Sequence, residues 1–212
     1  MTVLSDLVDL VVVLGEEREL PAVRSLHTPD ATASAGQSKK FGVVVLDDGS
    51  CGFFFAGLDD TLSHLRVCDP REFKGAATLD LVRNCLSTDP LARAVGLGAL
   101  NALSQHLLRI SGFKLDRASD PLGHLDLPSA RHVGLVGFFA PLIKVWAGNP
   151  GTLTIIEKDP QFLGQSIPFP VTTQTDRLRD CDRVLITGST LINDTLDDVL
   201  SHCDPAAQVA LV

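Results

Sequence analysis

The 212-residue sequence lacks an excess of basic residues, since 18 Lys and Arg stand against 26 Asp and Glu and the formal net charge is −8. A phosphate backbone calls for a basic face, so we expect no nucleic-acid partner. The sequence also lacks any apolar run near the ~20 residues of a membrane span. Its first apolar stretch, Leu10–Leu14, follows Asp6 and Asp9, where a signal peptide would carry Lys or Arg. We therefore expect a soluble, cytoplasmic protein with no membrane partner.

Metal and disulfide motifs are absent as well. The 5 cysteines are an odd number at wide spacing, with no C-x-x-C pair. Soft and borderline metal ions need three or four His, Cys or carboxylate ligands close together. Two pairs have helical i, i+4 spacing, His64 with Cys68 and Asp198 with His202, but each pair supplies only two ligands. A hard, oxygen-coordinated cation at Glu157 or Asp159 stays open, and no metal ligand set can be assigned.

Two catalytic and cofactor signatures are also missing. The chain has no G-x-S-x-G nucleophile elbow and no G-x-G-x-x-G dinucleotide loop, because Gly134 and Gly137 are followed by Phe-Phe-Ala-Pro. Glu157 nonetheless stands twenty residues beyond Gly137, where dinucleotide folds place the carboxylate that holds a ribose. The glycine pattern favours a Rossmann-like strand and turn without a dinucleotide.

What the sequence does contain is a β-turn-α-β unit between Arg131 and Asp159. Val133–Val136 is a short apolar run typical of a buried parallel strand, and Pro141 suits the first turn of the helix that follows. A second apolar run ends at Glu157. The carboxyl ends of neighbouring parallel strands meet at one edge of a sheet, so we expect ligand-binding groups at these strand tips.

A third parallel strand is predicted over residues 184–187, with a Gly-Ser-Thr turn and a helix near Asp194 after it. Thr190 and Asn193 can cap that helix or bind a ligand oxygen, and the two roles are compatible. Residues 161–174 contain two prolines and are expected to be irregular. Residues 208–212 begin a fourth strand at the terminus, which suggests a domain shortened at its C-terminus.

The first half of the chain predicts helices and a hairpin. Two apolar runs flank the turn Asp47–Ser50, whose Asp-Gly pair is a hairpin signal. The other expected elements are helices over 5–14, 76–87 and 90–110 and a strand over 22–27. In the longest helix, Gly96, Gly98 and nearby alanines form a small-residue side that lets another element approach closely. Asn101 on the same helix either faces a pocket or is hydrogen-bonded at a domain interface.

The two halves are joined by residues 111–129, which have glycine, two prolines, several charges and little periodicity. We interpret this stretch as an interdomain linker. The predicted fold class is α/β, with an N-terminal α+β domain over 1–115, made of the hairpin and helices. A Rossmann-like parallel sheet follows over 116–212.

Several segments together carry a family resemblance. VGLVGFFAPLIK, LTIIEKDP and CDRVLITGSTLINDTLDDVL in the second half, with FGVVVLDDGSCG and STDPLARAVGLGALNALSQ in the first, resemble the putative heavy-metal chelation family. The resemblance implies an enolase N-terminal-like domain followed by a Rossmann-like domain, with a pocket between them associated with metal binding. Carried over by motif, the pocket residues are Gly137, Phe138, Pro141, Glu157, Thr187, Gly188, Thr190 and Asn193.

Three functions follow as hypotheses. The first is a protein that binds a small polar ligand or a metal complex in the interdomain cleft, with a divalent or heavy-metal ion as the cofactor that the resemblance allows. The second is an enzyme that uses a nucleotide or S-adenosyl cofactor in the Rossmann-like domain, which Glu157 permits. The third is a non-catalytic subunit or truncated relic, and a homo-oligomer is compatible with each. Catalytic residues cannot be assigned.

Overall fold

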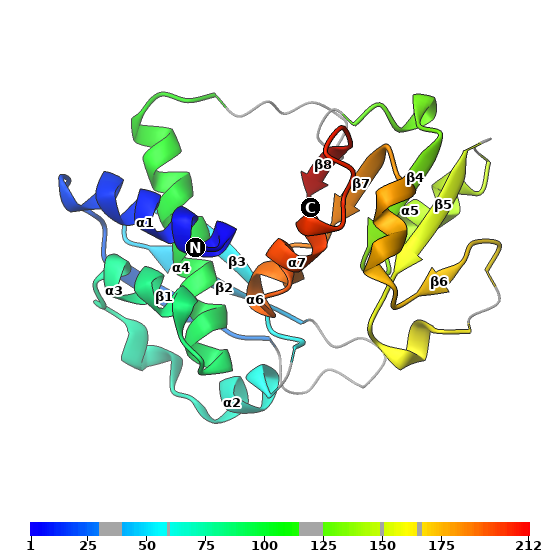
Figure 1. Cartoon of the computed structure of the whole chain (residues 1–212). Helices are drawn as coiled ribbons and strands as arrows, with labels where there is room; N and C mark the ends of the chain where they lie inside the picture. The colour runs from blue at the N-terminus through cyan, green and yellow to red at the C-terminus, as the bar shows by residue number, and fades with distance from the viewer. Residues whose placement is uncertain (30–39, 59, 115–124, 149–150, 165–166) are drawn as a thin grey trace. The chain divides into compact units, whose positions relative to one another are not determined.

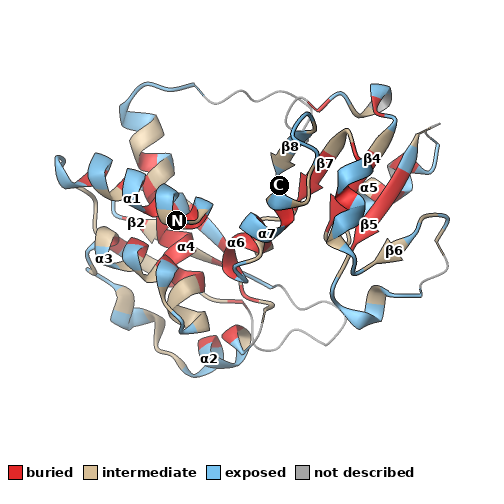
Figure 2. Ribbon diagram, in the orientation of Figure 1, coloured by how far each residue is buried: buried red, intermediate tan, exposed pale blue. Residues whose placement is uncertain are grey.

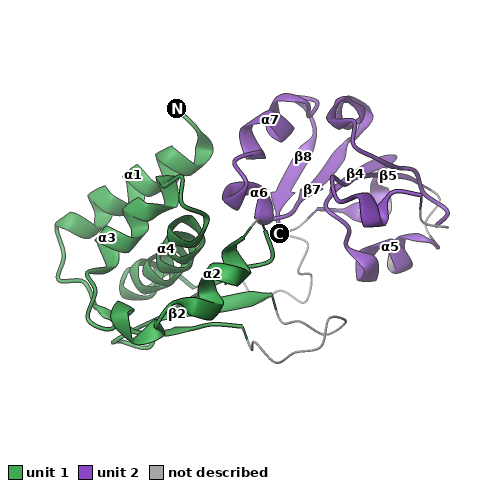
Figure 3. Ribbon diagram, turned by 90° about the horizontal axis from the view of Figure 1, so that it is seen from below, with its two compact units in different colours: residues 1–116 green, residues 117–212 purple. Residues whose placement is uncertain are grey.

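The computed structural model describes residues 1–29, 40–58, 60–114, 125–148, 151–164 and 167–212 (Figure 1). The chain forms two compact units, residues 1–116 and 117–212 (Figure 3). Most of the predicted linker, residues 115–124, lies outside the described residues, and its end forms the 3-10 turn Leu127–Ser129. In the described part of the chain, no helix combines the length and the apolar character needed to cross a membrane.

Unit 1 contains a three-stranded antiparallel sheet in the order β1-β2-β3, with four helices. Its elements are α1 (Val3–Glu16), β1 (Val23–His27), β2 (Phe41–Leu46), β3 (Cys51–Phe55), α2 (Thr61–Val67), α3 (Thr78–Arg83) and α4 (Pro90–Ile110). The predicted hairpin is confirmed, with Gly49 at φ 85° in its turn. The predicted long helix is confirmed too, since Asp89 accepts a hydrogen bond from the Ala92 N–H at 2.6 Å and Pro90 begins the helix.

The predicted helix over 76–87 is shorter than expected. Its α-helical part, α3, ends at Arg83, and residues Asn84–Leu86 form a tighter 3-10 turn. The backbone of this turn lies against α4, because a Cβ placed on Gly96 would be 2.6 Å from the Cys85 nitrogen. A 3-10 turn is a common way to end an α-helix, and no periodicity distinguishes it from one more α-helical turn.

The small residues of α4 allow a close approach, as predicted, but on two sides of the helix: Gly96 faces the 3-10 turn, and Gly98 and Ala102 face β3. A Cβ on Gly52 of β3 would lie 2.1 Å from the carbonyl oxygen of Gly98 and 2.3 Å from the nitrogen of Ala102. Two side-chain amides of α4 bind the outer edge of the same strand: Asn101 donates to the Phe53 carbonyl at 2.8 Å, and Gln105 accepts from the Cys51 N–H at 2.6 Å. Helix and strand are therefore in backbone contact.

The hairpin turn is joined to α4 by the carboxylate of Asp48. It accepts hydrogen bonds from His106 Nδ1 at 2.6 Å, from the Ser50 N–H at 2.9 Å and from the Arg109 guanidinium. Burial alone raises the pKa of Asp48, but the bonds from His106 and Ser50 and the charge of Arg109 outweigh it and lower the pKa to about 2. This cluster fixes the turn against the last third of the helix.

Unit 2 is a five-stranded parallel sheet in the order β6-β5-β4-β7-β8. Its elements are β4 (His132–Val136), α5 (Ala140–Trp146), β5 (Thr152–Ile156), β6 (Val171–Thr172), β7 (Arg183–Ile186), α6 (Ser189–Ile192), α7 (Leu196–Ser201) and β8 (Gln208–Leu211). Numbered within the unit, the strands run 3-2-1-4-5, which is the order of a doubly wound α/β sheet. The predicted α/β fold with a parallel sheet is confirmed.

Both faces of this sheet are covered, so its central strands are continuously buried (Figure 2). Ile143 and Trp146 of α5 pack with Leu135 and Leu185 in one core cluster, while α6 and α7 lie on the opposite face (Figure 3). The prediction that residues 161–174 are irregular is wrong in part, because β6 lies among them. A two-residue strand is too short to show alternation in a sequence.

Candidate functional site

The candidate site is the carboxyl edge of the parallel sheet, at the tips of β4 and β7. The chain adds strands on one side of β4 and then returns to its other side with β7, so the strand order reverses between these two neighbours. In open α/β sheets, ligands bind beyond the carboxyl ends of the strands at such a reversal. The two turns that follow β4 and β7 therefore form the candidate site.

Gly137 brings these two turns into contact. Its φ of 103° lies in a region that side chains disfavour. A Cβ at this position would be 3.1 Å from Thr187 Cγ2 and 3.3 Å from the ring of Phe139. The turn after β4 is thus adjacent to the turn after β7, and Gly137 and Thr187 are brought together as the sequence predicted for strand tips.

Glu157 joins the turns after β4 and β5. Its Oε2 accepts a hydrogen bond from the Phe138 N–H at 3.0 Å, and its Oε1 accepts from the N–H groups of Lys158 and Asp159 at 2.7 and 2.9 Å. The sequence spacing placed this carboxylate at a strand tip but did not predict these partners. Glu157 is a positioning residue here, and its Oε2 keeps one acceptor position for a further donor.

Removing this carboxylate should destabilise unit 2. We expect Glu157→Ala to lower the free energy of unfolding by about 2 kcal/mol, because three backbone N–H groups lose a charged acceptor. The free energy of unfolding of Glu157→Gln should lie between those of the wild type and Glu157→Ala, since the glutamine amide keeps one acceptor oxygen. The fluorescence of Trp146, the single tryptophan, reports unit 2 in urea unfolding. Asp176→Ala, which removes an exposed carboxylate of the same unit, is the control, and equal stability of both variants would contradict the assignment.

Phe138 and Phe139, in the turn after β4, contact different residues. Phe138 stacks on Phe162, with ring centroids 4.5 Å apart and an interplanar angle of 16°. The Phe139 ring lies beside Gly137, in the turn after β4 where a dinucleotide fold would have its glycine-rich loop. Phe162 was not singled out from the sequence, although Asp159-Pro160 is a capping pattern that predicts the 3-10 turn carrying it.

The turn after β7 is held by its own hydroxyl groups. Thr190, 3% exposed, donates to the Thr187 carbonyl at 2.7 Å. Thr187 Oγ1 accepts from the Ser189 N–H at 3.3 Å and lies 3.3 Å from Ser189 Oγ. The Gly188 N–H donates to the carbonyl of Val212 at 2.7 Å. Thr190 therefore has a structural role, and the hydroxyls of Thr187 and Ser189 remain half-exposed in the turn.

Three further predicted site residues have the following surroundings within their own units. Asn193 is at the far end of α6, 2.7 Å from the Thr195 hydroxyl, and with its nitrogen facing the helix it donates to the Ser189 and Thr190 carbonyls at 3.3 Å. Pro141 is exposed in the first turn of α5 and has no polar group to offer. Asn101 belongs to unit 1, where it binds β3.

The described residues do not fit a bare metal ion. Among them, no three His, Cys, Asp or Glu side chains lie close enough together to hold one. His64 and Cys68 remain a pair, and burial, with Glu72 and Asp69 nearby, raises the pKa of the Cys68 thiol. In the other pair, His202 Nδ1 bonds to the Asp198 carbonyl at 2.8 Å and lies 3.8 Å from its carboxylate. Neither pair is a complete ligand set.

The chain is similar to solved structures whose function is described as unknown. Crystal structures of proteins with unknown function, from Desulfitobacterium hafniense and Pyrococcus horikoshii, match 100% of this chain with TM-scores of 0.66 and 0.65. Their sequence identities are 18% and 16%, and the matches cover 79% and 78% of those chains. An uncharacterized protein of Methanocaldococcus jannaschii is 28% identical over 127 residues, which are 59% of this chain and 48% of the relative. The chain spans about half the length of that curated relative.

Two family models match separate parts of the sequence, residues 38–104 and residues 120–212. Both carry the description "Putative heavy-metal chelation", and the two crystal structures come from the family of the second model. The two matched ranges contain, in the same order, the segments that carry the family resemblance in the sequence. The chain belongs to the family described as putative heavy-metal chelation proteins.

Proposed function

We propose that unit 2 binds a small chelated metal ion, that is, a metal whose ligands come mainly from a small organic molecule. The observation that carries this proposal is the reversal of strand order between β4 and β7, with Gly137 and Thr187 in contact at that point. A reversal of this kind leaves a crevice for a ligand in open α/β sheets. The proposal concerns this edge of unit 2 alone.

The choice of a chelate over a free ion rests on the donor groups. The family description names heavy-metal chelation, while the described residues offer no set of three metal ligands. A chelate supplies its own donors and needs hydrogen-bonding groups from the protein instead. Ser189 Oγ lies 3.3 Å from Thr187 Oγ1 and can donate its hydrogen to a carboxylate of the chelator. The stacked rings of Phe138 and Phe162, in the turns after β4 and β5, offer a planar apolar surface of the same unit.

The backbone of the site leaves little room for a nucleotide phosphate. The Phe138 N–H is bound to Glu157, and the N–H groups of Ser189 and Thr190 are bound to Thr187. A phosphate at a strand tip depends on free backbone N–H groups. These three N–H groups are therefore engaged, and the open acceptor position of Glu157 is what supports the alternative of an enzyme with a nucleotide or S-adenosyl cofactor.

Thermal unfolding followed by Trp146 fluorescence tests the proposal. The probes are Zn²⁺, citrate, Zn²⁺–citrate, ATP and S-adenosylmethionine, each with the full chain. We expect Zn²⁺–citrate to raise the melting temperature of unit 2 more than Zn²⁺ or citrate alone, because a ligand at about 100 times its Kd adds about 2.7 kcal/mol. Stabilisation by ATP or S-adenosylmethionine alone would favour the enzyme, and equal stabilisation by free Zn²⁺ would reject the chelate.

Paired substitutions locate the binding. The double variant Thr187→Val/Ser189→Ala should lose the Zn²⁺–citrate shift, because it removes both hydroxyls of the turn. Ser129→Ala is the matched control, since that serine precedes β4 and lies at the opposite edge of the sheet. A shift that survives in the double variant would place the ligand elsewhere and refute the proposed site.

A further inference from the structure

Helix α1 carries two apolar seams, of which its own unit buries one. Leu4, Val8, Val11 and Gly15 are buried. Val3, Leu7, Leu10 and Leu14, here called the outer seam, remain 40%, 37%, 54% and 40% exposed. A surface helix of a globular protein normally has one apolar stripe and a polar opposite side. The outer seam is therefore an apolar face that the described residues of unit 1 cover only in part.

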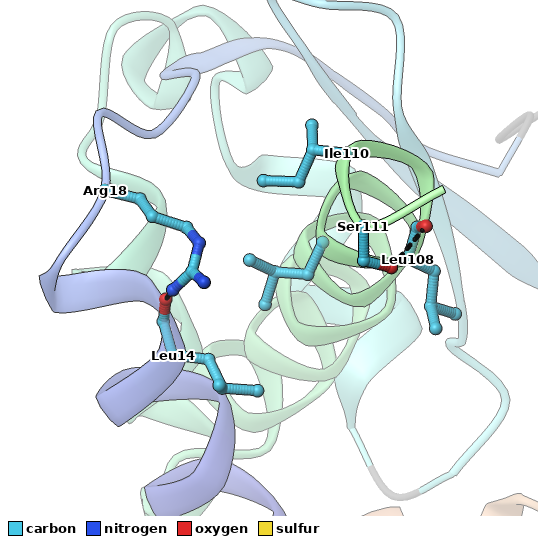
Figure 4. A pocket seen from close by; sticks show the side chains of 6 residues that line it. Leu14, Arg18, Leu108, Ile110 and Ser111 are labelled. Atoms are coloured by element: carbon cyan, nitrogen blue, oxygen red, sulfur yellow. Dashed lines mark hydrogen bonds between the residues drawn. The ribbon is translucent and has the colours of Figure 1, made fainter. Parts of the chain in front are cut away.

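A groove continues the outer seam at its C-terminal end. It has a volume of about 270 Å³ and lies between the ends of α1 and α4 (Figure 4). Its lining is formed by Leu14, Arg18, Leu107, Leu108, Ile110 and Ser111. The guanidinium of Arg18 donates to the Leu14 carbonyl, which ties this charge to the end of its own helix. The exposed apolar surface thus extends from α1 onto the end of α4.

We propose that the outer seam is a homodimer interface, in which α1 of one copy packs antiparallel on α1 of a second copy about a twofold axis. The seam positions 3, 7, 10 and 14 are separated by four, three and four residues. This spacing reads the same in both directions, as a twofold antiparallel pair requires. Val3 of one copy then meets Leu14 of the other, and Leu7 meets Leu10.

The surroundings of the seam fit a second copy. In the antiparallel pair, Asp6 of one copy falls beside Val13 of the other, so that no acidic pair faces across the seam. The start of the second α1 falls at the groove beside Leu14, and Met1, which is fully exposed, can enter it. Each groove therefore receives the start of α1 of the other copy.

The interface should be weak. Standard-size protein interfaces bury about 1,200–2,000 Å² in total, and a pair of 14-residue helices is short for that range. We expect reversible dimerisation in the micromolar range, measurable by sedimentation velocity of the full chain between about 1 and 200 µM. A wild-type chain that stays monomeric over this range would overturn the proposal.

Two charge variants test the geometry. Leu10→Glu should weaken dimerisation at least tenfold, because it places a charge in the apolar seam; Leu10 is 54% exposed, so the fold tolerates it. Val67→Glu, at an 85% exposed apolar residue of α2, is the matched control and should leave dimerisation unchanged. Leu7→Lys/Leu10→Glu should restore the dimer, since each Lys then faces a Glu of the other copy. A dimer unaffected by Leu10→Glu, or not restored by the double variant, would refute the antiparallel pairing.

Discussion

Replacing Gly52 by alanine should lower the free energy of unfolding of unit 1 by about 3 kcal/mol, at the upper end of overpacking costs. The added Cβ would meet the carbonyl oxygen of Gly98 at 2.1 Å and the nitrogen of Ala102 at 2.3 Å. Both are backbone atoms, so no side chain can rotate away to make room. The strand and the helix would have to separate along their whole contact.

Hydrogen exchange of the amides in β2, β3 and α4 is the measurement, because it reports unit 1 directly. Trp146 fluorescence follows unit 2 in the same sample and should be unchanged. Gly148→Ala is the control, since a Cβ there meets nothing within 4 Å. Equal exchange rates in wild type and Gly52→Ala would show that the helix and the strand are not in backbone contact.

The second large effect is expected at Asp48, the carboxylate that joins the hairpin turn to α4. Asp48→Asn should cost about 2 kcal/mol at pH 7, because it removes a charged acceptor from His106 and Arg109 and turns one oxygen into a donor. The side chain is only 19% exposed, so water replaces few of these bonds. Chemical unfolding followed by hydrogen exchange in unit 1 measures the loss.

This effect should depend on pH in one direction. The folded pKa of Asp48 is about 2, below its ordinary value of 3.8, so its contribution is complete above about pH 4 and is lost as the pH falls towards 2. The stability difference between wild type and Asp48→Asn should therefore shrink between pH 5 and pH 2. Asp9→Asn, at an exposed carboxylate of α1, is the control and should have little effect. If the stability difference between wild type and Asp48→Asn stayed constant with pH, the lowered pKa of Asp48 would be contradicted.

Much of the fold could be predicted because its signals are local. The Asp-Gly pair predicts the hairpin turn, and Asp89-Pro90 fixes the start of α4. The small side of α4 also predicts a close approach, although the sequence does not identify Gly52 as the partner. Residues such as those of β6 escape prediction, since pairing with a neighbouring strand, and not periodicity, makes them a strand.

The convergence of the strand tips could be predicted from the sequence, whereas the hydrogen-bond partners of the candidate residues could not. Parallel strand tips converge, so Gly137 and Thr187 meet as expected. The partners of Glu157 depend on where the amides of two turns point, which no spacing encodes. Asn193 illustrates the same limit, because an amide near the end of a short helix can bind that helix's own carbonyls. Polar residue types predict the capacity to bind and leave the partner undetermined.

The side-chain amides of Asn101 and Gln105, which bind the backbone of β3, should reduce the tendency of the protein to aggregate. Asn101 and Gln105 occupy backbone groups that the outer strand would otherwise present to a strand from another molecule. At the other end of the sheet, β1 exchanges bonds with Gly75 and Ala76 through both backbone groups of Val23. Because backbone groups of both edge strands are already hydrogen-bonded within the chain, this sheet should resist pairing with strands of other molecules, the step that leads to fibrils.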